Sequence, residues 1–281
     1  MSFAVHHLMS GYPGRPVLHD LSLSQTAGGG ITALLGPNGA GKSTALRAIA
    51  GLLPARGEVR LDSVDLLALS PRDRARKVAF VPQMLPSGVG LTVLEASVAA
   101  IRAARPGLSR ESAAEAALTA LDRLGAGGLA LDRLDRLSGG QRQMAGLAPA
   151  LAGDAPLLLL DEPTSMLDIA HQHRVMQLLA EIARDGRRIV VVLHDIPLAA
   201  AWAERVAVLE SGRLAAEGAT EAEVDAPDPF RRLHPCAMAA QMLCDQPGER
   251  GCLRGSDAGG GGHLRHGHAL QSVAGCAGRP G

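Results

Sequence analysis

The chain has 281 residues, of which 47% are hydrophobic, so it can bury the core of one large domain. Basic and acidic side chains number 28 each, and this zero net charge gives no electrostatic case for a nucleic-acid partner. No run of 18 or more apolar residues occurs, and the first residues lack the basic-then-apolar pattern of a signal peptide. We therefore expect a cytosolic protein that reaches a membrane only through a partner.

The first half of the chain has the patterns of strands that lead into a helix. Residues 1 to about 30 alternate polar and apolar side chains, which predicts antiparallel strands. The apolar run 31–35 predicts a buried strand that enters a glycine-rich turn, and the spacing over 44–52 predicts a helix after it. Two further short strands are expected, over 57–61 and 78–81.

The second half alternates helical and strand patterns. Residues 91–125 are rich in Ala, Leu, Glu and Arg with a period near 3.6, which predicts a helical subdomain over about 84–150. A helix is expected after Gly140. Later helices are expected over 171–184 and 197–204, and strands over 157–160, 188–193, 206–209 and 213–216. This alternation predicts an α/β domain with a mostly parallel sheet.

The composition changes near Val224, so we expect one folded domain over 1–224 and a low-order tail over 225–281. All four cysteines and a run of four glycines lie in this tail. Our hypothesis is that this tail is a frameshifted or divergent end without an evolved function. The alternative is a tail that binds metal weakly through His263, His266 and His268.

The strongest motif follows the strand over 31–35. It is the run Gly36, Pro37, Asn38, Gly39, Ala40, Gly41, Lys42, Ser43 and Thr44, a full GxxxxGK[ST] match between a predicted strand and a predicted helix. Glycines let successive backbone N–H groups turn toward phosphate oxygens, and a helix N-terminus favours anions. We expect this loop to bind ATP, with Lys42 on the β- and γ-phosphates and Ser43 on Mg²⁺.

A second motif is the apolar run 157–160, which is followed at once by Asp161 and Glu162. Ligands of open α/β sheets bind at the carboxyl ends of the strands. We expect Asp161 to hold Mg²⁺ through water and Glu162 to act as the general base that polarises the attacking water. Taken alone, the pair also fits a strand end that exposes two solvated acids.

The third motif is Leu137, Ser138, Gly139, Gly140 and Gln141. The same residues also fit a helix N-cap by Ser138, and a helix N-terminus is itself a phosphate site. This LSGGQ run before the acidic strand resembles the signature of the ATP-binding cassette (ABC) proteins. The resemblance implies that Ser138, Gly139, Gly140 and Gln141 meet the ATP held by a second copy of the chain. Two ATP molecules would then lie sandwiched in a head-to-tail dimer.

The remaining marks of the family occur in the expected order. The resemblance implies that Tyr12 stacks on adenine, although Tyr12 also fits a surface turn beside Gly11 and Pro13. It implies that Gln83 contacts Mg²⁺ and the attacking water and communicates with the membrane subunits. It also implies that Asp168 communicates across the dimer and that His194 bonds the γ-phosphate.

A single cassette without fused membrane helices or a long heptad insertion resembles the ATPase subunit of an importer. The runs 91–96, 143–148 and 168–172 are similar to the group that imports iron chelates, heme and cobalamin. We expect a siderophore importer, with heme or cobalamin as the alternatives. The implied partners are the transmembrane permease subunits, a second copy of this chain and, indirectly, an external solute-binding protein. The implied location is the cytoplasmic face of the membrane, where the permease holds the chain.

Two other functions remain open at this point. One is a soluble, non-transport ABC ATPase, although such proteins carry coiled-coil insertions or tandem cassettes that this chain lacks. The other is a regulatory cassette without turnover, and Pro149 keeps this alternative open because a proline inside a helix removes a hydrogen bond. Pro149 is expected to kink the helix that positions Ser138. The looser turn at 28–30 is the other departure from the family pattern.

Overall fold

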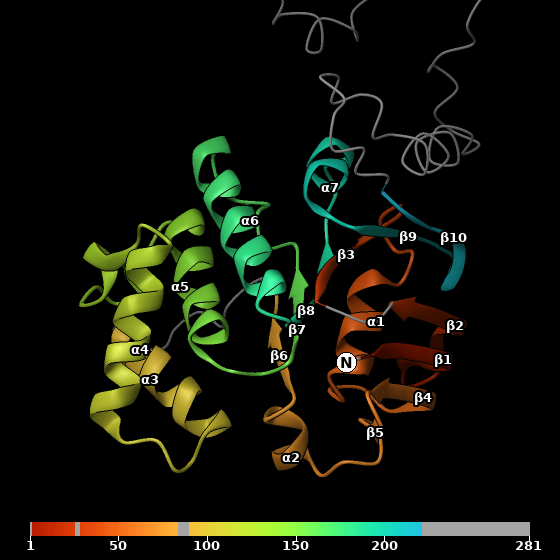
Figure 1. Cartoon of the computed structure of the whole chain (residues 1–281), viewed down its shortest axis with the longest axis horizontal. Helices are drawn as coiled ribbons and strands as arrows, with labels where there is room; N and C mark the ends of the chain where they lie inside the picture. The colour runs from red at the N-terminus through yellow and green to blue at the C-terminus, as the bar shows by residue number, and fades with distance from the viewer. Residues whose placement is uncertain (1, 26–28, 84–89, 221–281) are drawn as a thin grey trace, which may run out of the picture.

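The computed structural model describes residues 2–25, 29–83 and 90–220. Two sheets and seven α-helices form this part of the chain (Figure 1). The strands are β1 (Phe3–Tyr12), β2 (Arg15–Gln25), β3 (Gly30–Leu35), β4 (Ala55–Leu61), β5 (Val64–Asp65), β6 (Val78–Val81), β7 (Leu157–Asp161), β8 (Arg188–Val192), β9 (Arg205–Glu210) and β10 (Arg213–Ala219). The α-helices are α1 (Lys42–Ile49), α2 (Pro71–Ala75), α3 (Val93–Ala104), α4 (Arg110–Arg123), α5 (Gly139–Ala152), α6 (Ile169–Arg184) and α7 (Ile196–Trp202). The two 3-10 helices, η1 (Gly127–Leu129) and η2 (Leu134–Arg136), precede α5.

The smaller sheet is antiparallel, with the strand order β2-β1-β4-β5, as the alternation over the first residues predicts. Phe3, Val5 and Leu8 of β1 are buried, and they belong to one core cluster with Leu46 and Ile49 of α1. This sheet therefore covers the helix that begins at Lys42.

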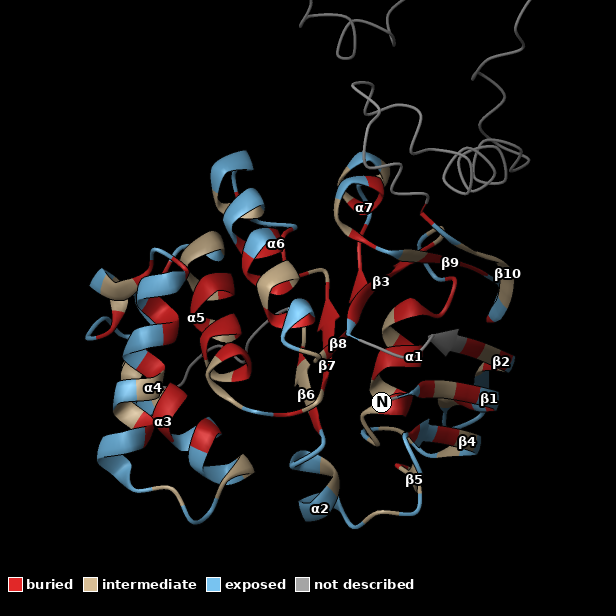
Figure 2. Cartoon of the chain, viewed as in Figure 1, coloured by how far each residue is buried: buried red, intermediate tan, exposed pale blue. Residues whose placement is uncertain are grey.

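The larger sheet has the order β10-β9-β3-β8-β7-β6 and is parallel except for β10. Every residue of β3, β7 and β8 is buried, as Figure 2 shows in red. Leu157 and Leu159 of β7 pack in one core cluster with α1, whereas Leu158 and Leu160 pack in the other with α5 and α6. Alternate side chains of a strand point to opposite faces, so helices cover both faces of this sheet. The predicted α/β class with a mostly parallel core sheet is confirmed.

Three helices, α3, α4 and α5, pack together to the left of the sheet in Figure 1. The segment expected to be helical over 91–125 contains two helices, because Pro106 and Gly107 interrupt it. A capping box of Thr92 and Glu95 starts α3, in which each side chain bonds a backbone N–H of the other residue. None of the helices among the described residues is long and apolar enough to cross a bilayer.

Several expected boundaries shift in the structure. The first helix begins at Lys42 and ends at Ile49, earlier than the expected range of 44–52, because Gly41 already starts it as the N-cap. Pro149 does not end α5, which continues as a single helix to Ala152. The lost hydrogen bond is that of the Ala145 carbonyl, in the middle of the helix. The expected boundary near Val224, the tail and the first residue of the turn at 28–30 lie outside the described residues.

Candidate active site

The glycine-rich loop lies between the end of β3 and the start of α1. Gly36, Gly39 and Gly41 have φ values of 141°, 80° and 102°, a region that other residues rarely adopt. A Cβ atom on Gly36 would lie 2.1 Å from the carbonyl oxygen of Leu209, so the loop also needs glycine for space. The loop therefore turns sharply from the strand into the N-terminus of α1, where backbone N–H groups and the helix dipole favour an anion.

The ammonium group of Lys42 lies within this loop. Its Nζ donates to the carbonyl oxygens of Gly36 at 2.7 Å and Pro37 at 3.0 Å, and the residue is only 5% exposed. Burial lowers the pKa of Lys42, and the nearby charges of Glu162 and Asp161 oppose this effect. A phosphate beside Lys42 would restore the solvation that burial removes, which fits the predicted role of this lysine.

Ser43 and Asp161 meet across the loop and the end of β7. The hydroxyl of Ser43 donates to Oδ1 of Asp161 at 2.8 Å, and Asp161 is 1% exposed. Its Oδ2 atom is buried and has no hydrogen-bond partner within the described part of the chain. Burial raises the pKa of Asp161, the Ser43 hydrogen bond lowers it and the charge of Glu162 raises it. A buried carboxylate oxygen without a partner, next to a hydroxyl, fits the oxygen ligands that Mg²⁺ requires.

Glu162 follows β7 and lies between two side chains from neighbouring strands. In the parallel register, Val81 of β6 pairs with Leu160, which pairs with Val191 of β8, so these three strands end side by side. The chain continues from them to Gln83, Glu162 and His194.

These three side chains form direct contacts. The amide Nε2 of Gln83 donates to Oε2 of Glu162 at 2.6 Å, and Nε2 of His194 lies 2.5 Å from Oε1 of the same carboxylate. Glu162 also has a φ of 53°, in the left-handed region that is unfavourable for most residues. This geometry brings a carboxylate, an amide and an imidazole together, and their roles toward a water and a phosphate stay predictions.

Tyr12 lies at the end of β1, on the turn to β2, and is 40% exposed. Its hydroxyl accepts a hydrogen bond from Nη1 of Arg47 at 3.1 Å, and Arg47 belongs to α1, the helix that starts at Lys42. The ring is therefore accessible and is tied to the helix that follows the glycine-rich loop. This position is compatible with stacking on a base, and the role itself stays a prediction.

The signature residues start α5. Ser138 is the N-cap, and its hydroxyl accepts from the N–H of Gln141 at 3.3 Å while Oε1 of Gln141 accepts from the N–H of Ser138 at 3.0 Å. The capping role that the sequence suggests for Ser138 is thus confirmed. Gly139 and Gly140 lie against Met166, because an added Cβ on either glycine would come within 2.8 Å of an atom of Met166.

Asp168 caps α6. One of its carboxylate oxygens accepts from the backbone N–H of His171 and lies 2.9 Å from Nδ1 of the same residue, and these bonds lower the pKa of Asp168. One chain therefore brings Lys42, Ser43, Asp161 and Glu162 together. The signature starts α5, which packs on the opposite face of β7 and β8 from α1 (Figure 1).

Three further residues, which no sequence motif assigns to the site, contact this region. Arg47 donates to the hydroxyl of Tyr12, and Gln143 donates to the backbone carbonyl of Glu162. Gln172 donates to the backbone carbonyls of Thr164 and Leu167. The only sequence signal was that Gln143 and Gln172 lie inside runs that resemble the importer group. Neither run indicates which backbone groups these side chains reach.

Comparisons with known proteins agree with this geometry. The family model described as ABC transporter matches residues 18–165, which is more than half of the chain. The hemin import ATP-binding protein HmuV of Nocardia farcinica is 47% identical over 211 residues, covering 73% of this chain and 72% of the relative. HmuV of Streptomyces coelicolor is 46% identical over 207 residues, covering 73% of each chain.

Solved structures of the same fold are also similar. The ATP-binding cassette MJ0796, in a dimeric post-hydrolysis state with ADP and Pi, is 30% identical with a TM-score of 0.71, covering 78% of this chain and 99% of that one. An ABC transporter described as of the metal-chelate type, in an inward-facing conformation, is 28% identical with a TM-score of 0.64, covering 78% of this chain and 83% of that one. The glycine-rich loop, the acidic pair at the end of β7 and the signature at α5 all lie within residues 18–165, which the family model matches. The chain belongs to the ABC transporter family, as an ATP-binding cassette of the kind that acts as an ATPase coupled to transport.

Proposed function

We propose that this chain is the ATPase subunit of a heme importer. The observation that supports heme as the cargo is the name of the similar relatives. These are hemin import proteins, matched over about seven tenths of both chains. The expected siderophore cargo has no such support. Heme, one of the two alternatives to it, is favoured. We further propose 1–224 as the ATPase unit, with its helical subdomain over about 84–150.

Within one chain, the proposed nucleotide site uses the geometry of the glycine-rich loop. The backbone of Gly36 to Thr44 and the side chain of Lys42 would hold the phosphates, and Ser43 and Asp161 would hold Mg²⁺. The metal ion supplies charge neutralisation on the phosphate oxygens. Glu162 accepts a proton from the attacking water, and Gln83 and His194 orient the water and the phosphate.

The signature would act on the nucleotide of a second copy. Because α5 lies across the sheet from α1, Ser138 to Gln141 would face the nucleotide of the second copy rather than the site that Lys42 starts in the same chain. A head-to-tail pair brings the free helix N-terminus at Ser138 to the partner's phosphates, where it would act as a second anion site. The dimeric state described for the similar cassette MJ0796 supports this arrangement. Asp168, at the start of α6, would lie between the two copies.

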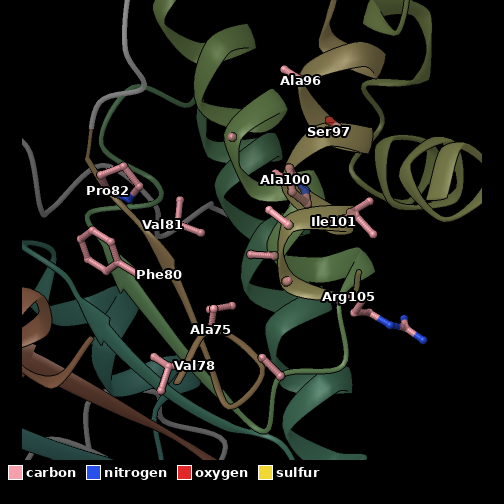
Figure 3. Close-up of a pocket in the computed structure, with 18 of the residues that line it drawn as sticks. Ala75, Val78, Phe80, Val81, Pro82, Ala96, Ser97, Ala100, Ile101 and Arg105 are labelled. Atoms are coloured by element: carbon pink, nitrogen blue, oxygen red, sulfur yellow. The ribbon is translucent and has the colours of Figure 1, made fainter. Parts of the chain in front are cut away.

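The permease would dock in an apolar groove of about 680 Å³ between β6 and α3 (Figure 3). Figure 3 shows Val78, Phe80, Val81 and Pro82 on one side and Ala96, Ser97, Ala100 and Ile101 on the other. Ala145 and Pro149 of α5 complete the lining, and Arg105 pairs with Asp154 at 2.8 Å where α3 ends. Most of the lining side chains are small, so the groove has room for bulky apolar side chains of a permease segment. Pro82 in its wall precedes Gln83, and its α5 wall belongs to the helix that Ser138 caps, so a shift of the docked segment would act on both elements.

Substitutions at two exposed alanines of α3 test whether the permease docks in this groove. Ala100 lines it, whereas the neighbouring Ala99 is also exposed but does not. Ala100→Glu should abolish copurification with the permease and leave ATP binding by the purified chain intact, because a buried unpaired carboxylate is costly. Ala99→Glu is the matched control and should copurify normally. Equal copurification of both variants would place the permease contact elsewhere.

The cargo is tested by uptake of labelled heme in cells that lack this gene. The cells are complemented with the wild type, with Glu162→Gln or with Glu115→Gln, the last being an exposed glutamate of α4. The wild type and Glu115→Gln should restore ATP-dependent heme uptake, and Glu162→Gln should not. Parallel assays with labelled ferric siderophore and cobalamin examine the other two cargos.

Each outcome decides a different part of the proposal. Restoration of siderophore or cobalamin uptake without heme uptake would keep the importer and reject heme as its cargo. Failure of the wild type with all three cargos would reject the importer and favour a non-transport ATPase. Full heme uptake with Glu162→Gln would reject Glu162 as the base. The external solute-binding protein and the location at the cytoplasmic face stay predictions that depend on this result.

A further inference from the structure

The side chain of Gln143 joins the signature helix to the segment after β7. Gln143 belongs to α5 and is only 8% exposed. Its Nε2 atom donates to the carbonyl oxygen of Glu162 at 2.6 Å and to Oγ of Ser165 at 3.3 Å, and its Oε1 accepts from the N–H of Met166 at 2.9 Å. Both ends of the amide are therefore used, and all three partners lie between Glu162 and Met166.

The backbone of Glu162 is the part of this segment that most needs such support. Its φ of 53° lies in the left-handed region, which costs a residue with a Cβ about 1 to 2 kcal/mol. The same carbonyl oxygen also accepts from the N–H of Ser165 at 3.3 Å and from its hydroxyl at 3.1 Å. Surrounding hydrogen bonds must hold a backbone of this kind in place. The direction of the Glu162 carboxylate, toward Gln83 and His194, depends on this backbone conformation.

The packing around Gln143 leaves little room for α5 to move relative to the segment from Glu162 to Met166. An added Cβ on Gly140 would lie 2.8 Å from the carbonyl oxygen of Met166, and one on Gly139 would lie 2.8 Å from its Sδ atom. Met166 is therefore held by Gln143 through its N–H and is packed against the two signature glycines. A displacement of the start of α5 would move Met166 and, through Gln143, the backbone of Glu162.

We propose that Gln143 is a positioning residue that sets the orientation of Glu162 and couples it to the signature of the same chain. The signature would contact the nucleotide held by the second copy, while Glu162 would act on the nucleotide held by its own chain. Gln143 thus links the two sites of the dimer through a short path inside one chain. This inference rests on the proposed function, because it assumes that Glu162 is the base and that the signature meets the partner's ATP.

The first test removes the hydrogen bonds of Gln143 and keeps its shape. Gln143→Met should lower kcat for ATP hydrolysis by the purified full-length chain by about 10- to 100-fold, because small misplacements of a reacting group have effects of this size. The KM for ATP should change by less than about threefold, since Gln143 contacts none of the loop that binds phosphate. The matched control is Gln177→Met, at an exposed position of α6, which should behave as the wild type.

A second variant tests the hydrogen bond itself. In Gln143→Glu, the new carboxylate cannot donate to the carbonyl of Glu162, but its protonated form can. Burial next to Glu162 should raise the pKa of the new carboxyl group. Activity relative to the wild type should therefore recover as the pH is lowered from about 8.5 to about 6. Thermal melts over the same pH range separate this recovery from a change in stability, because a purely structural defect would recover only in step with the folded fraction. Because this variant keeps the size of glutamine, it also tests the proposal if Gln143→Met fails to fold.

A third variant separates Gln143 from general ordering of the segment. Gln172 of α6 donates to the carbonyls of Thr164 at 3.1 Å and Leu167 at 3.0 Å but does not contact Glu162. Gln172→Met should lower kcat clearly less than Gln143→Met. Equal losses, wild-type kcat in Gln143→Met, or no pH-dependent recovery in Gln143→Glu would each overturn the proposal. If the wild type hydrolyses no ATP, with or without its permease, the proposed function itself fails and this inference fails with it.

Discussion

Nε2 of His194 lies 2.5 Å from Oε1 of Glu162, across the adjacent ends of β8 and β7. The second carboxylate oxygen of Glu162 accepts from Gln83 at 2.6 Å, so both oxygens have partners. Glu162 is largely buried in this arrangement, with a side-chain exposure of 14%, whereas His194 is more open at 44%. The carboxylate is therefore oriented in advance, and each of its oxygens keeps a second lone pair that can accept a proton from water.

His194→Ala tests the contribution of this contact to turnover. We expect kcat for ATP hydrolysis to fall by about 100-fold, which is typical for the loss of a group that assists proton transfer or charge stabilisation. The KM for ATP should change little, because His194 does not contact the glycine-rich loop. His6→Ala, at an exposed position of β1, is the control. Steady-state kinetics decide, and a kcat within threefold of the wild type would contradict this role for His194.

Asp161→Asn separates stability from metal binding. Because the pKa of Asp161 is raised in the folded state, the folded chain binds more protons than the unfolded chain between the ordinary and the raised pKa. Stability therefore falls as the pH rises through this window, and the charged carboxylate destabilises the nucleotide-free protein at neutral pH. We expect Asp161→Asn to raise the melting temperature by a few degrees, on the order of 1 kcal/mol. Mg-ATP should no longer raise it further, because the variant lacks the anionic ligand.

Thermal melts with and without Mg-ATP measure both effects for Asp161→Asn. Asp135→Asn, in an exposed ion pair with Arg133, is the control and should keep the full Mg-ATP shift. An undiminished Mg-ATP shift in Asp161→Asn would show that the metal is held elsewhere.

The two capping boxes allow a matched comparison. Ser138→Ala and Thr92→Ala should each lower the free energy of unfolding by about 1 kcal/mol, because each removes an N-cap hydrogen bond. Only Ser138→Ala should also reduce ATP hydrolysis, since the cap of α3 has no contact with a nucleotide in the proposed dimer. Urea unfolding and steady-state kinetics measure the two effects. Equal losses of activity in both variants would mean that the signature acts only through stability.

Pro149→Ala should stabilise the chain. The proline leaves the Ala145 carbonyl without its helical partner, and α5 nevertheless continues to Ala152. Alanine restores the N–H, so we expect the free energy of unfolding to rise by about 1 to 3 kcal/mol. Urea unfolding measures this change, with Pro106→Ala as a control in the break between α3 and α4, where no helix is restored. A lower free energy of unfolding in Pro149→Ala would show that packing of the proline ring stabilises the chain by more than the missing hydrogen bond costs.

The sequence by itself determined which residues are candidates for the proposed nucleotide site. The loop from Gly36 to Thr44, the acids after 157–160 and the cap at Ser138 are local patterns, and each reflects a requirement of a few consecutive residues. The alternation of strand and helix patterns also determined the α/β class, because apolar periodicity depends on neighbours along the chain. Helix ends were less certain from sequence, since Gly41 starts α1 earlier and Pro106 with Gly107 divides the helical segment.

Only the tertiary structure decided how distant segments meet. The sheet order β3-β8-β7-β6 differs from the order in sequence, and it brings Gln83, Glu162 and His194 together at three adjacent strand ends. The contacts of Gln143 with the backbone of Glu162 and Met166 likewise join two segments that no local pattern connects. Strand neighbours are chosen by hydrogen bonds and packing between segments far apart in the chain, and these interactions leave no spacing in the sequence from which they can be read.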